Sequence, residues 1–144
     1  MDKKKRVIIF EDEEPLKDLF TLVIERHGCE VDFYESPFYF PVNQCIECLK
    51  NGSKRCADIL LTDIVMPVVS GLDFIEDWLT KGCKIPQIGI MSGYWTDDKI
   101  IRAKKLGGTI LEKPVPVSTL SSWLKECINK IDNAKKIEYH HSEY

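Results

Sequence analysis

Short apolar runs alternate along the chain with longer stretches in which apolar residues recur every three or four positions. The short runs are typical of buried strands, and the longer stretches are typical of helices that bury one face. We predict strands at residues 7–10, 30–34, 58–62, 87–91 and 109–111. We predict helices with apolar stripes within residues 15–24, 71–79, 96–106 and 120–131, and a further helix that ends near Leu49.

This alternation of strand and helix predicts an α/β domain. Several of the strands are apolar throughout, as expected where helices cover both faces of a parallel sheet. The predicted architecture is a doubly wound, five-stranded parallel sheet with helices on both faces. The chain has 144 residues, 44% of them hydrophobic, which is enough for one core. We expect one domain over residues 1–134 and a short C-terminal tail over residues 135–144.

Two local signals support the predicted helix starts. Pro15 suits the first turn of a helix, because the N–H that proline lacks would have no partner there. Thr96 can cap the next-to-last helix, because its hydroxyl can accept a hydrogen bond from a free backbone N–H. We expect that helix to carry Ile100, Ile101 and Leu106 as its apolar residues.

Charge and composition exclude several classes of function. The net charge is −3 and the isoelectric point is near 5.6, so the chain lacks the basic field that nucleic-acid binding requires. The basic residues 3–6 are most simply the solvated start of a strand. The apolar run at residues 7–10 is too short for a signal peptide or a membrane span. We therefore expect a cytoplasmic protein with reduced thiols that binds neither nucleic acid directly nor membrane.

Three of the six cysteines, Cys45, Cys48 and Cys56, lie close together in the sequence. Structural zinc usually takes four ligands in two close pairs, and only one close pair is present here. Cys45 and Cys48 would share one face of a helix, so they are equally well explained as small core residues. Because the second pair is missing, we favour the core interpretation.

Polar residues stand where the predicted strands end. Glu11 and Asp12 follow the first strand, Asp63 the third, Ser92 the fourth and Lys113 the fifth. In a doubly wound sheet, chemistry lies beyond the carboxyl ends of the strands. We therefore expect these side chains to converge at one edge of the sheet.

Such a cluster favours a particular chemistry. Neighbouring carboxylates repel one another unless a cation neutralises them, and a few oxygen ligands with room for water suit Mg²⁺. Asp63 could then act as a nucleophile toward a phosphoryl group, with Lys113 and Ser92 stabilising the phosphoryl oxygens. Each residue alone is equally typical of a turn or a helix start, but the set together favours phosphoryl transfer.

Four sequence blocks carry a family resemblance: the acidic run within residues 10–15, residues 63–67 with Gly71, residues 91–93, and Lys113-Pro114. Their order and spacing resemble those of the response-regulator receiver family of two-component signal transduction, over about residues 5–133. The resemblance implies the flavodoxin-like strand order 2-1-3-4-5 and a signalling domain that is not an enzyme.

The resemblance also implies a phosphoacceptor and a metal site. Asp63 would accept a phosphoryl group from the phosphohistidine of a histidine kinase or a histidine phosphotransfer protein. The implied cofactor is Mg²⁺, with Glu11, Asp12, Asp63 and the backbone carbonyl of Val65 as its ligands.

Two further features follow from the resemblance. Ser92 would swing toward the phosphoryl group, and Lys113 would pair with it. The peptide bond between Lys113 and Pro114 is expected to be cis, an isomer essentially confined to bonds that precede proline.

The chain departs from the family pattern at three places. Glu11 stands where many relatives have aspartate, so its longer side chain could reach the metal through water. Ile110 stands where many relatives have tyrosine or phenylalanine, so the aromatic rotamer coupling of the family is not expected here. The segment over residues 36–56 is longer than usual, and its aromatic residues 38–40 fit core packing and partner contact equally well.

The signal is expected to leave through protein contacts. Only residues 135–144 follow the last predicted helix, which is too few for a helix-turn-helix or a catalytic output domain. We expect an unknown downstream protein or output domain as partner, and a homodimer through the face formed by the fourth helix, fifth strand and fifth helix. Tyr94 and Trp95, at the edge of this face, could anchor a partner or pack locally.

A flavin-binding domain of the same layout is one alternative, and it is disfavoured by the acidic strand ends and by the lack of a glycine loop that cradles phosphate. Two further alternative functions compete with the phosphorylated receiver. One is a receiver-like interaction module that works without phosphorylation. The other is an aspartate-nucleophile phosphohydrolase, which is disfavoured because Val65 stands where such an enzyme usually has a second aspartate.

Overall fold

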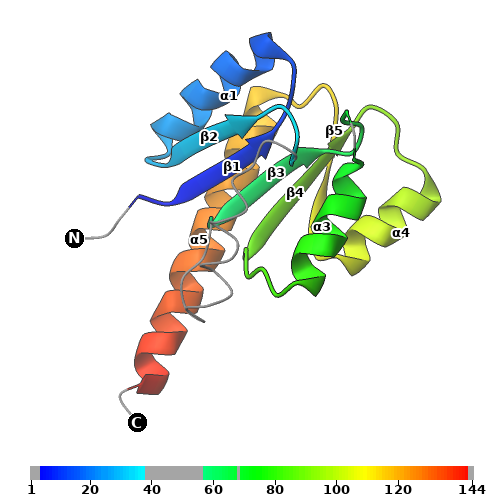
Figure 1. Cartoon of the computed structure of the whole chain (residues 1–144). Coiled ribbons are helices and arrows are strands. Elements are labelled where there is room, and N and C mark those ends of the chain that lie inside the picture. The colour runs from blue at the N-terminus through cyan, green and yellow to red at the C-terminus, as the bar shows by residue number, and fades with distance from the viewer. Residues whose placement is uncertain (1–3, 38–56, 68, 143–144) are drawn as a thin grey trace.

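The computed structural model describes residues 4–37, 57–67 and 69–142. Five parallel strands form one sheet in the order β2-β1-β3-β4-β5 (Figure 1). The strands are β1 (Arg6–Phe10), β2 (Glu30–Tyr34), β3 (Ile59–Asp63), β4 (Gln87–Ser92) and β5 (Gly108–Glu112). The helices within the described residues are α1 (Glu14–Arg26), α3 (Gly71–Thr80), α4 (Asp97–Lys105) and α5 (Val117–Ser142).

The predicted fold class is confirmed. Each predicted strand is present with no end shifted by more than one residue, and the strand order matches the expected one. The helix predicted to end near Leu49, the aromatic residues 38–40 and the cysteines at 45, 48 and 56 lie outside the described residues.

Alternate residues of the buried strands pack on opposite faces of the sheet, as the period of two in a strand requires. On one face, Ile8 and Phe10 pack with α3 and with Ala103 of α4. On the other face, Val7 and Ile9 pack with α1 and α5. Figure 1 shows the same two layers of helix around the sheet. The sheet is therefore covered on both sides, and the open polar surface lies at the strand ends.

The register of the strands fixes where the functional residues stand. Asp63 pairs with Met91 across β3 and β4, and Ser92 pairs with Glu112 across β4 and β5. Since all five strands are parallel, their carboxyl ends lie at one edge of the sheet. The expected convergence thus follows directly from the strand pairing.

The helix starts confirm both local predictions. Pro15 lies in the first turn of α1, and the Thr96 hydroxyl accepts a hydrogen bond of 3.3 Å from the backbone N–H of Lys99. Of the apolar residues expected in α4, Ile101 is 54% exposed, and the fully buried residue of this helix is Ala103. Three apolar residues in a short helix do not show, from the sequence alone, which of them faces the sheet.

Helix α5 continues past residue 134 to Ser142 and extends beyond the edge of the sheet in Figure 1. The expected boundary at residue 134 therefore falls inside a helix, and the division into domain and tail stays a prediction. Among the described helices, none combines the length and the apolar character that a membrane span needs.

Gly89 in β4 provides a test of the packing between α5 and the sheet. A Cβ atom at this position would lie 2.6 Å from Cζ2 of Trp123, so alanine would displace the indole ring. We expect Gly89→Ala to lower the free energy of unfolding by about 1–3 kcal/mol, measured by urea denaturation. Gly93→Ala is the matched control, since no atom lies within 4 Å of its added Cβ. Equal stability of the two variants would contradict this packing.

Candidate functional site

The turn after β1 supplies the first acidic residues of the site. The backbone N–H of Glu11 donates to the carbonyl of Tyr34 on β2 at 3.0 Å, which continues the strand pairing. The side chain of Glu11 points inward and is fully buried. Its Oε1 accepts hydrogen bonds from the backbone N–H groups of Asp12 at 3.1 Å and Glu13 at 3.2 Å. The adjacent Asp12 is exposed, and no described residue donates a hydrogen bond to its carboxylate.

Asp63 is the last residue of β3 and only 5% exposed. The chain turns directly after it, with the backbone N–H of Gly71 donating to the carbonyl of Ile64 at 2.8 Å. Gly71 lies against the backbone carbonyl of Asp63, where a Cβ atom would collide with it. The Ser70 hydroxyl caps α3 by accepting a hydrogen bond of 3.2 Å from the N–H of Asp73. Glycine at 71 and the cap at 70 therefore fix the loop that orients Asp63.

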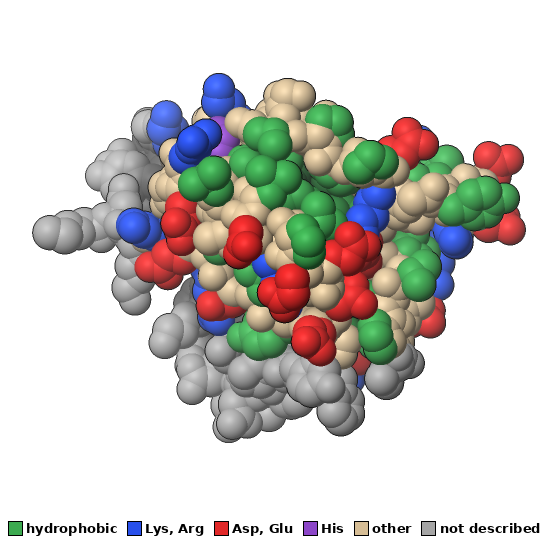
Figure 2. All heavy atoms as spheres, turned by 90° about the horizontal axis from the view of Figure 1, so that it is seen from above, with side chains coloured by type: hydrophobic (Ala, Val, Ile, Leu, Met, Phe, Trp, Pro, Cys, Tyr) green, Lys and Arg blue, Asp and Glu red, His purple; other side chains and the backbone are tan. Residues whose placement is uncertain are grey.

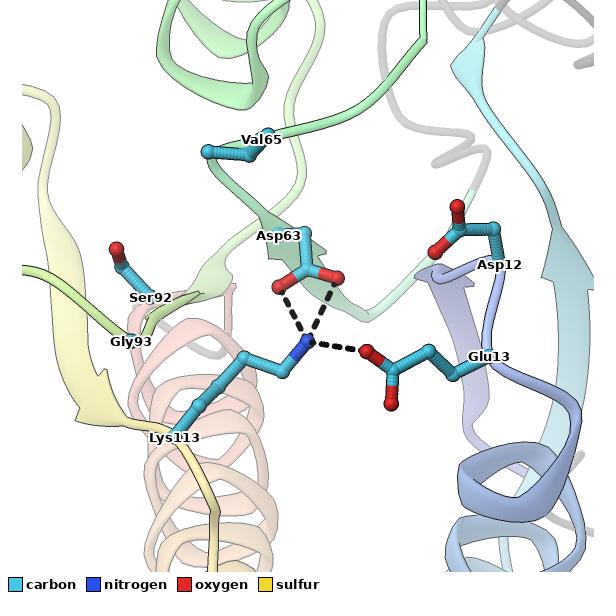
Figure 3. Close-up of a pocket in the computed structure, with 7 residues that line it drawn as sticks. All are labelled: Asp12, Glu13, Asp63, Val65, Ser92, Gly93 and Lys113. Carbon is cyan, nitrogen blue, oxygen red and sulfur yellow. Dashed lines mark hydrogen bonds and ion pairs between the residues drawn. The ribbon is translucent and has the colours of Figure 1, made fainter.

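Lys113 reaches the site from the end of β5. Its backbone N–H donates to the carbonyl of Ser92 at 2.9 Å, and its peptide bond to Pro114 is cis, as expected. The ammonium Nζ lies 3.0 Å from Oδ1 and 3.1 Å from Oδ2 of Asp63 (Figure 3). It also donates to Oε2 of Glu11 at 3.2 Å. One ammonium thus pairs with two buried carboxylates that come from the ends of different strands.

Ser92 borders the same hollow as Asp63, but its hydroxyl is hydrogen-bonded to the backbone of Tyr94. Its Oγ accepts a hydrogen bond from the N–H of Tyr94 and donates to the carbonyl of Tyr94, both at 3.1 Å. In the view of Figure 3, Ser92 and Asp12 lie on opposite sides of the Asp63 carboxylate. The hydroxyl would have to leave the backbone of Tyr94 before it could contact a group on Asp63.

A hollow of about 300 Å³ opens over these residues. It is lined by Asp12, Glu13, Asp63, Val65, Ser92, Gly93 and Lys113. Figure 2 looks onto this end of the molecule, where acidic side chains gather near the middle of the view with hydrophobic side chains beside them. The hollow is open to solvent and large enough for a small anionic group.

Burial and crowding shift the pKa values of these residues. Burial, followed by the hydrogen bond with Glu11, raises the pKa of Asp63 to about 7, and Lys113 offsets this only in part. Burial also disfavours the Glu11 carboxylate, but hydrogen bonds from Asp63, the N–H of Glu13 and Lys113 outweigh burial and lower its pKa. Burial disfavours the Lys113 ammonium, yet its bonds to Asp63 and Glu11 raise its pKa. The cluster therefore holds more negative charge than one lysine can neutralise.

The donor set fits a small divalent cation. Glu11, Asp12 and Asp63 offer one carboxylate oxygen each, and these atoms all lie within 4.8 Å of one another. Mg²⁺ binds few protein oxygens and keeps several waters, which an open acidic hollow permits. A divalent ion beside Asp63 would also favour its charged form, and so would oppose the burial and the neighbouring Glu11 that together raise its pKa.

The chain matches the family model of the response regulator receiver domain over residues 7–125. The chain belongs to this family. The chain spans about half the length of the curated relatives that it matches. It is 24% identical over 120 residues to a probable transcriptional regulatory protein of Picosynechococcus sp., covering 83% of this chain and 47% of that protein. It is 20% identical to the alkaline phosphatase synthesis transcriptional regulatory protein SphR of Synechococcus elongatus, covering 89% and 50% of the two chains.

Solved structures share the fold of this receiver domain. The N-terminal domain of an uncharacterized protein from Wolinella succinogenes aligns with a TM-score of 0.70 and 25% identity, covering 92% of this chain and 99% of that one. A receiver domain from Clostridium thermocellum aligns with a TM-score of 0.69 and 25% identity, covering 90% of this chain and 98% of that one. The beryllofluoride-activated NtrC4 receiver domain dimer aligns with a TM-score of 0.67 and 20% identity, covering 87% of this chain and 97% of that one. At this identity the likeness supports a shared fold and nothing further.

The receiver domain brings together the site residues predicted from the sequence. Glu11, Asp63 and Lys113 are in direct contact, while Asp12 and Ser92 line or border the same hollow. Glu13 is not among the site residues predicted from the sequence, although its Oε1 lies 3.9 Å from the Lys113 ammonium. The run of acidic residues after β1 was the available signal, but it did not say which of them face the hollow.

The two aromatic residues at the edge of the site behave differently. The indole of Trp95 donates to the carbonyl of Leu111 at 3.2 Å and packs against the core, which is the local packing alternative. Tyr94 is 73% exposed, and the Lys99 ammonium lies 5.6 Å from the centre of its ring. Ile110 packs partly buried against the same core cluster as Trp95.

The raised pKa of Asp63 predicts that Asp63→Asn stabilises the receiver domain in the absence of divalent cations. The folded pKa of about 7 lies above the value of an unfolded aspartate, so this group makes the wild type lose stability as pH rises toward and through 7. We expect the variant to gain roughly 1–3 kcal/mol at about pH 8, and less at about pH 5, where Asp63 is protonated.

Urea denaturation at both pH values, with a chelator present, measures this gain. Asp18→Asn, which removes an exposed carboxylate of α1, is the control and should change little at either pH. A variant that is less stable than wild type at the higher pH, or a gain that is independent of pH, would contradict the charge crowding at Asp63.

Proposed function

We propose that this receiver domain accepts a phosphoryl group on Asp63, in a Mg²⁺-dependent reaction, from the phosphohistidine of a histidine kinase or a histidine phosphotransfer protein. The observation that carries the proposal is the contact of Lys113 with both oxygens of Asp63 inside an open acidic hollow. A structural ion pair would not need an opening beside it, or a third carboxylate, that of Asp12, to which no described residue donates a hydrogen bond.

The side chains present can perform the transfer largely by position and charge. A carboxylate oxygen of Asp63 attacks the phosphorus atom, the bond between phosphorus and the donor nitrogen breaks, and an aspartyl phosphate forms. The electrons of that bond leave with the donor imidazole, which then takes up a proton. The Lys113 ammonium, already 3.0 Å from Asp63, is placed to contact the phosphoryl oxygens.

Asp12, Asp63 and the backbone carbonyl of Val65 are the ligands that we propose for Mg²⁺, with Glu11 as the remaining candidate of the acidic cluster. When bound, Mg²⁺ would neutralise the negative charge of the carboxylates and of the incoming phosphoryl group. Val65 is 79% exposed and lines the hollow, which supports its backbone as a candidate ligand.

Ser92 is the proposed sensor of the phosphoryl group. Its hydroxyl would exchange the carbonyl of Tyr94 for a phosphoryl oxygen, since the hydroxyl already borders the hollow. Release of the Ser92 hydroxyl would free the backbone of Tyr94, so the segment that carries the exposed Tyr94 ring would change when Asp63 is phosphorylated.

The partners are proposed from the relatives. The curated relatives are named as transcriptional regulatory proteins, and the NtrC4 receiver domain was solved as a dimer. We propose that this chain passes its signal through protein contacts, to a downstream protein or output domain or to a second copy through the face of α4, β5 and α5.

Incubation with phosphoramidate and Mg²⁺, followed by intact mass measurement, tests the function. We expect a mass gain of one phosphoryl group that is base-labile, that needs Mg²⁺, and that Asp63→Asn abolishes. Asp18→Asn, an exposed aspartate on α1, should be phosphorylated like wild type.

The same measurement separates the alternatives. Absence of any mass gain would overturn the proposed phosphorylation and favour an interaction module that works without it. Repeated turnover of a phosphomonoester, with no stable mass gain, would favour a phosphohydrolase.

A further inference from the structure

Thr62 is a fully buried polar residue to which the proposed transfer assigns no part. It stands one position before Asp63 in β3 and pairs with Phe10 of β1. Residues of a strand alternate between the two faces of the sheet, so Thr62 lies on the face that α3 covers, together with Leu60. A hydroxyl in a core is unfavourable unless it is hydrogen-bonded, so the partners of this hydroxyl are informative.

The Thr62 hydroxyl contacts the end of β3 and the loop after it. Its Oγ1 donates a hydrogen bond to the backbone carbonyl of Asp63 at 3.0 Å, and the sulfur of Met66 lies 3.6 Å away. The hydroxyl carries one proton, and a thioether sulfur is a weak acceptor, so the bond to the carbonyl is the principal one. The backbone of Gly71 lies against the same carbonyl, and a Cβ atom there would come within 3.2 Å of the hydroxyl. The carbonyl of Asp63 therefore lies between Thr62 and the start of α3.

The direction of this carbonyl is linked to the geometry of the hollow. A peptide group is planar, so fixing the Asp63 carbonyl fixes the whole plane between Asp63 and Ile64. That plane sets the direction in which the loop leaves the strand, relative to the Asp63 carboxylate. Val65, the next residue of the loop, lines the same hollow as that carboxylate. A hydrogen bond to this carbonyl therefore bears on how two sides of the hollow are placed relative to each other.

We propose that Thr62 is a positioning residue of the phosphoacceptor site, and that its hydroxyl holds the peptide plane between Asp63 and Ile64. The hydroxyl itself does not touch the phosphoryl group, because Thr62 is fully buried and does not line the hollow. Its role is to keep the attacking carboxylate and the loop at Val65 in the geometry that the transfer needs. This inference deepens the proposed function and rests on it.

Core packing alone is the alternative role for a buried threonine, and two variants separate it from positioning. Thr62→Val keeps a branched apolar side chain without the hydroxyl, and Thr62→Ser keeps the hydroxyl without the methyl group. In Thr62→Val a methyl group would stand where the hydroxyl now lies, 3.0 Å from the Asp63 carbonyl oxygen. Contacts between such carbon and oxygen atoms are about 3.3–3.6 Å long, so the carbonyl would have to turn away.

The rate at which phosphoramidate phosphorylates the protein at saturating Mg²⁺, followed by intact mass, measures the role in the transfer. We expect Thr62→Val to be slower than wild type by roughly three- to tenfold, as for the loss of one hydrogen bond of ordinary net strength. Thr62→Ser should stay within about twofold of the wild-type rate, although urea unfolds it more easily because a buried methyl group is missing. Thr62→Val reacting as fast as wild type, or Thr62→Ser reacting as slowly as Thr62→Val, would overturn the inference.

Thr80→Val is the matched control for the loss of a threonine hydroxyl. The hydroxyl of Thr80 also donates to a backbone carbonyl, that of Glu76 at 2.7 Å, but Thr80 lies at the opposite end of α3 from Gly71. This variant loses the same kind of bond as Thr62→Val, and it should be phosphorylated at the rate of wild type. Equal slowing of the two variants would overturn a role that is specific to Thr62.

A readout that needs no phosphorylation separates the inference from the proposed function. The NMR chemical shift of the isotope-labelled carbonyl carbon of Asp63 reports whether its oxygen accepts a hydrogen bond. We expect this signal to move in Thr62→Val and to stay near its wild-type position in Thr62→Ser; a signal that stays in both would overturn the inference. If wild type gains no phosphoryl mass, the proposed function fails, while the signal still decides whether Thr62 holds the carbonyl. If wild type is phosphorylated and Thr62→Val reacts at the same rate, the inference alone fails.

Discussion

The ion pair of Lys113 with Glu11 and Asp63 is the interaction on which the site depends. It joins the ends of three strands, because Glu11 follows β1, Asp63 ends β3 and Lys113 follows β5. One ammonium cannot neutralise the carboxylates around it, and burial raises the pKa of Asp63 to about 7. This incomplete neutralisation supports the proposed binding of a further cation, and the opening beside it supports the proposed entry of a phosphoryl group.

The fold holds the side chains of this ion pair in place through strand pairing and a few backbone contacts. Parallel pairing brings the strand ends to one edge, and helices cover both faces of the sheet, so the polar residues that follow the strands gather at that edge. Gly71 permits the close approach of α3 to the carbonyl of Asp63, and the backbone of Lys113 is tied to Ser92. The geometry of the site is therefore a consequence of strand register and of two short loops.

The strands and the convergence of the site could be predicted because they depend on patterns of short range and on one rule about parallel sheets. The contact between Glu11 and Lys113 could not, since it joins residues that are 102 positions apart and depends on how far each side chain turns inward. The exposure of Ile101 and the different surroundings of Tyr94 and Trp95 likewise depend on how α4 lies against the sheet. The course of α5 past residue 134 was missed because the apolar stripe weakens there while the helix itself continues.

The most direct test of the central claim is the titration of the Asp63 side-chain carboxyl, followed by NMR of its labelled carboxyl carbon with and without Mg²⁺. Without Mg²⁺ we expect a midpoint of about 7, because burial and the neighbouring Glu11 disfavour the charged form. With saturating Mg²⁺ we expect a clearly lower midpoint, because a bound cation favours the charged carboxylate. A midpoint near the ordinary value of about 4, unchanged by Mg²⁺, would contradict a buried and incompletely neutralised cluster.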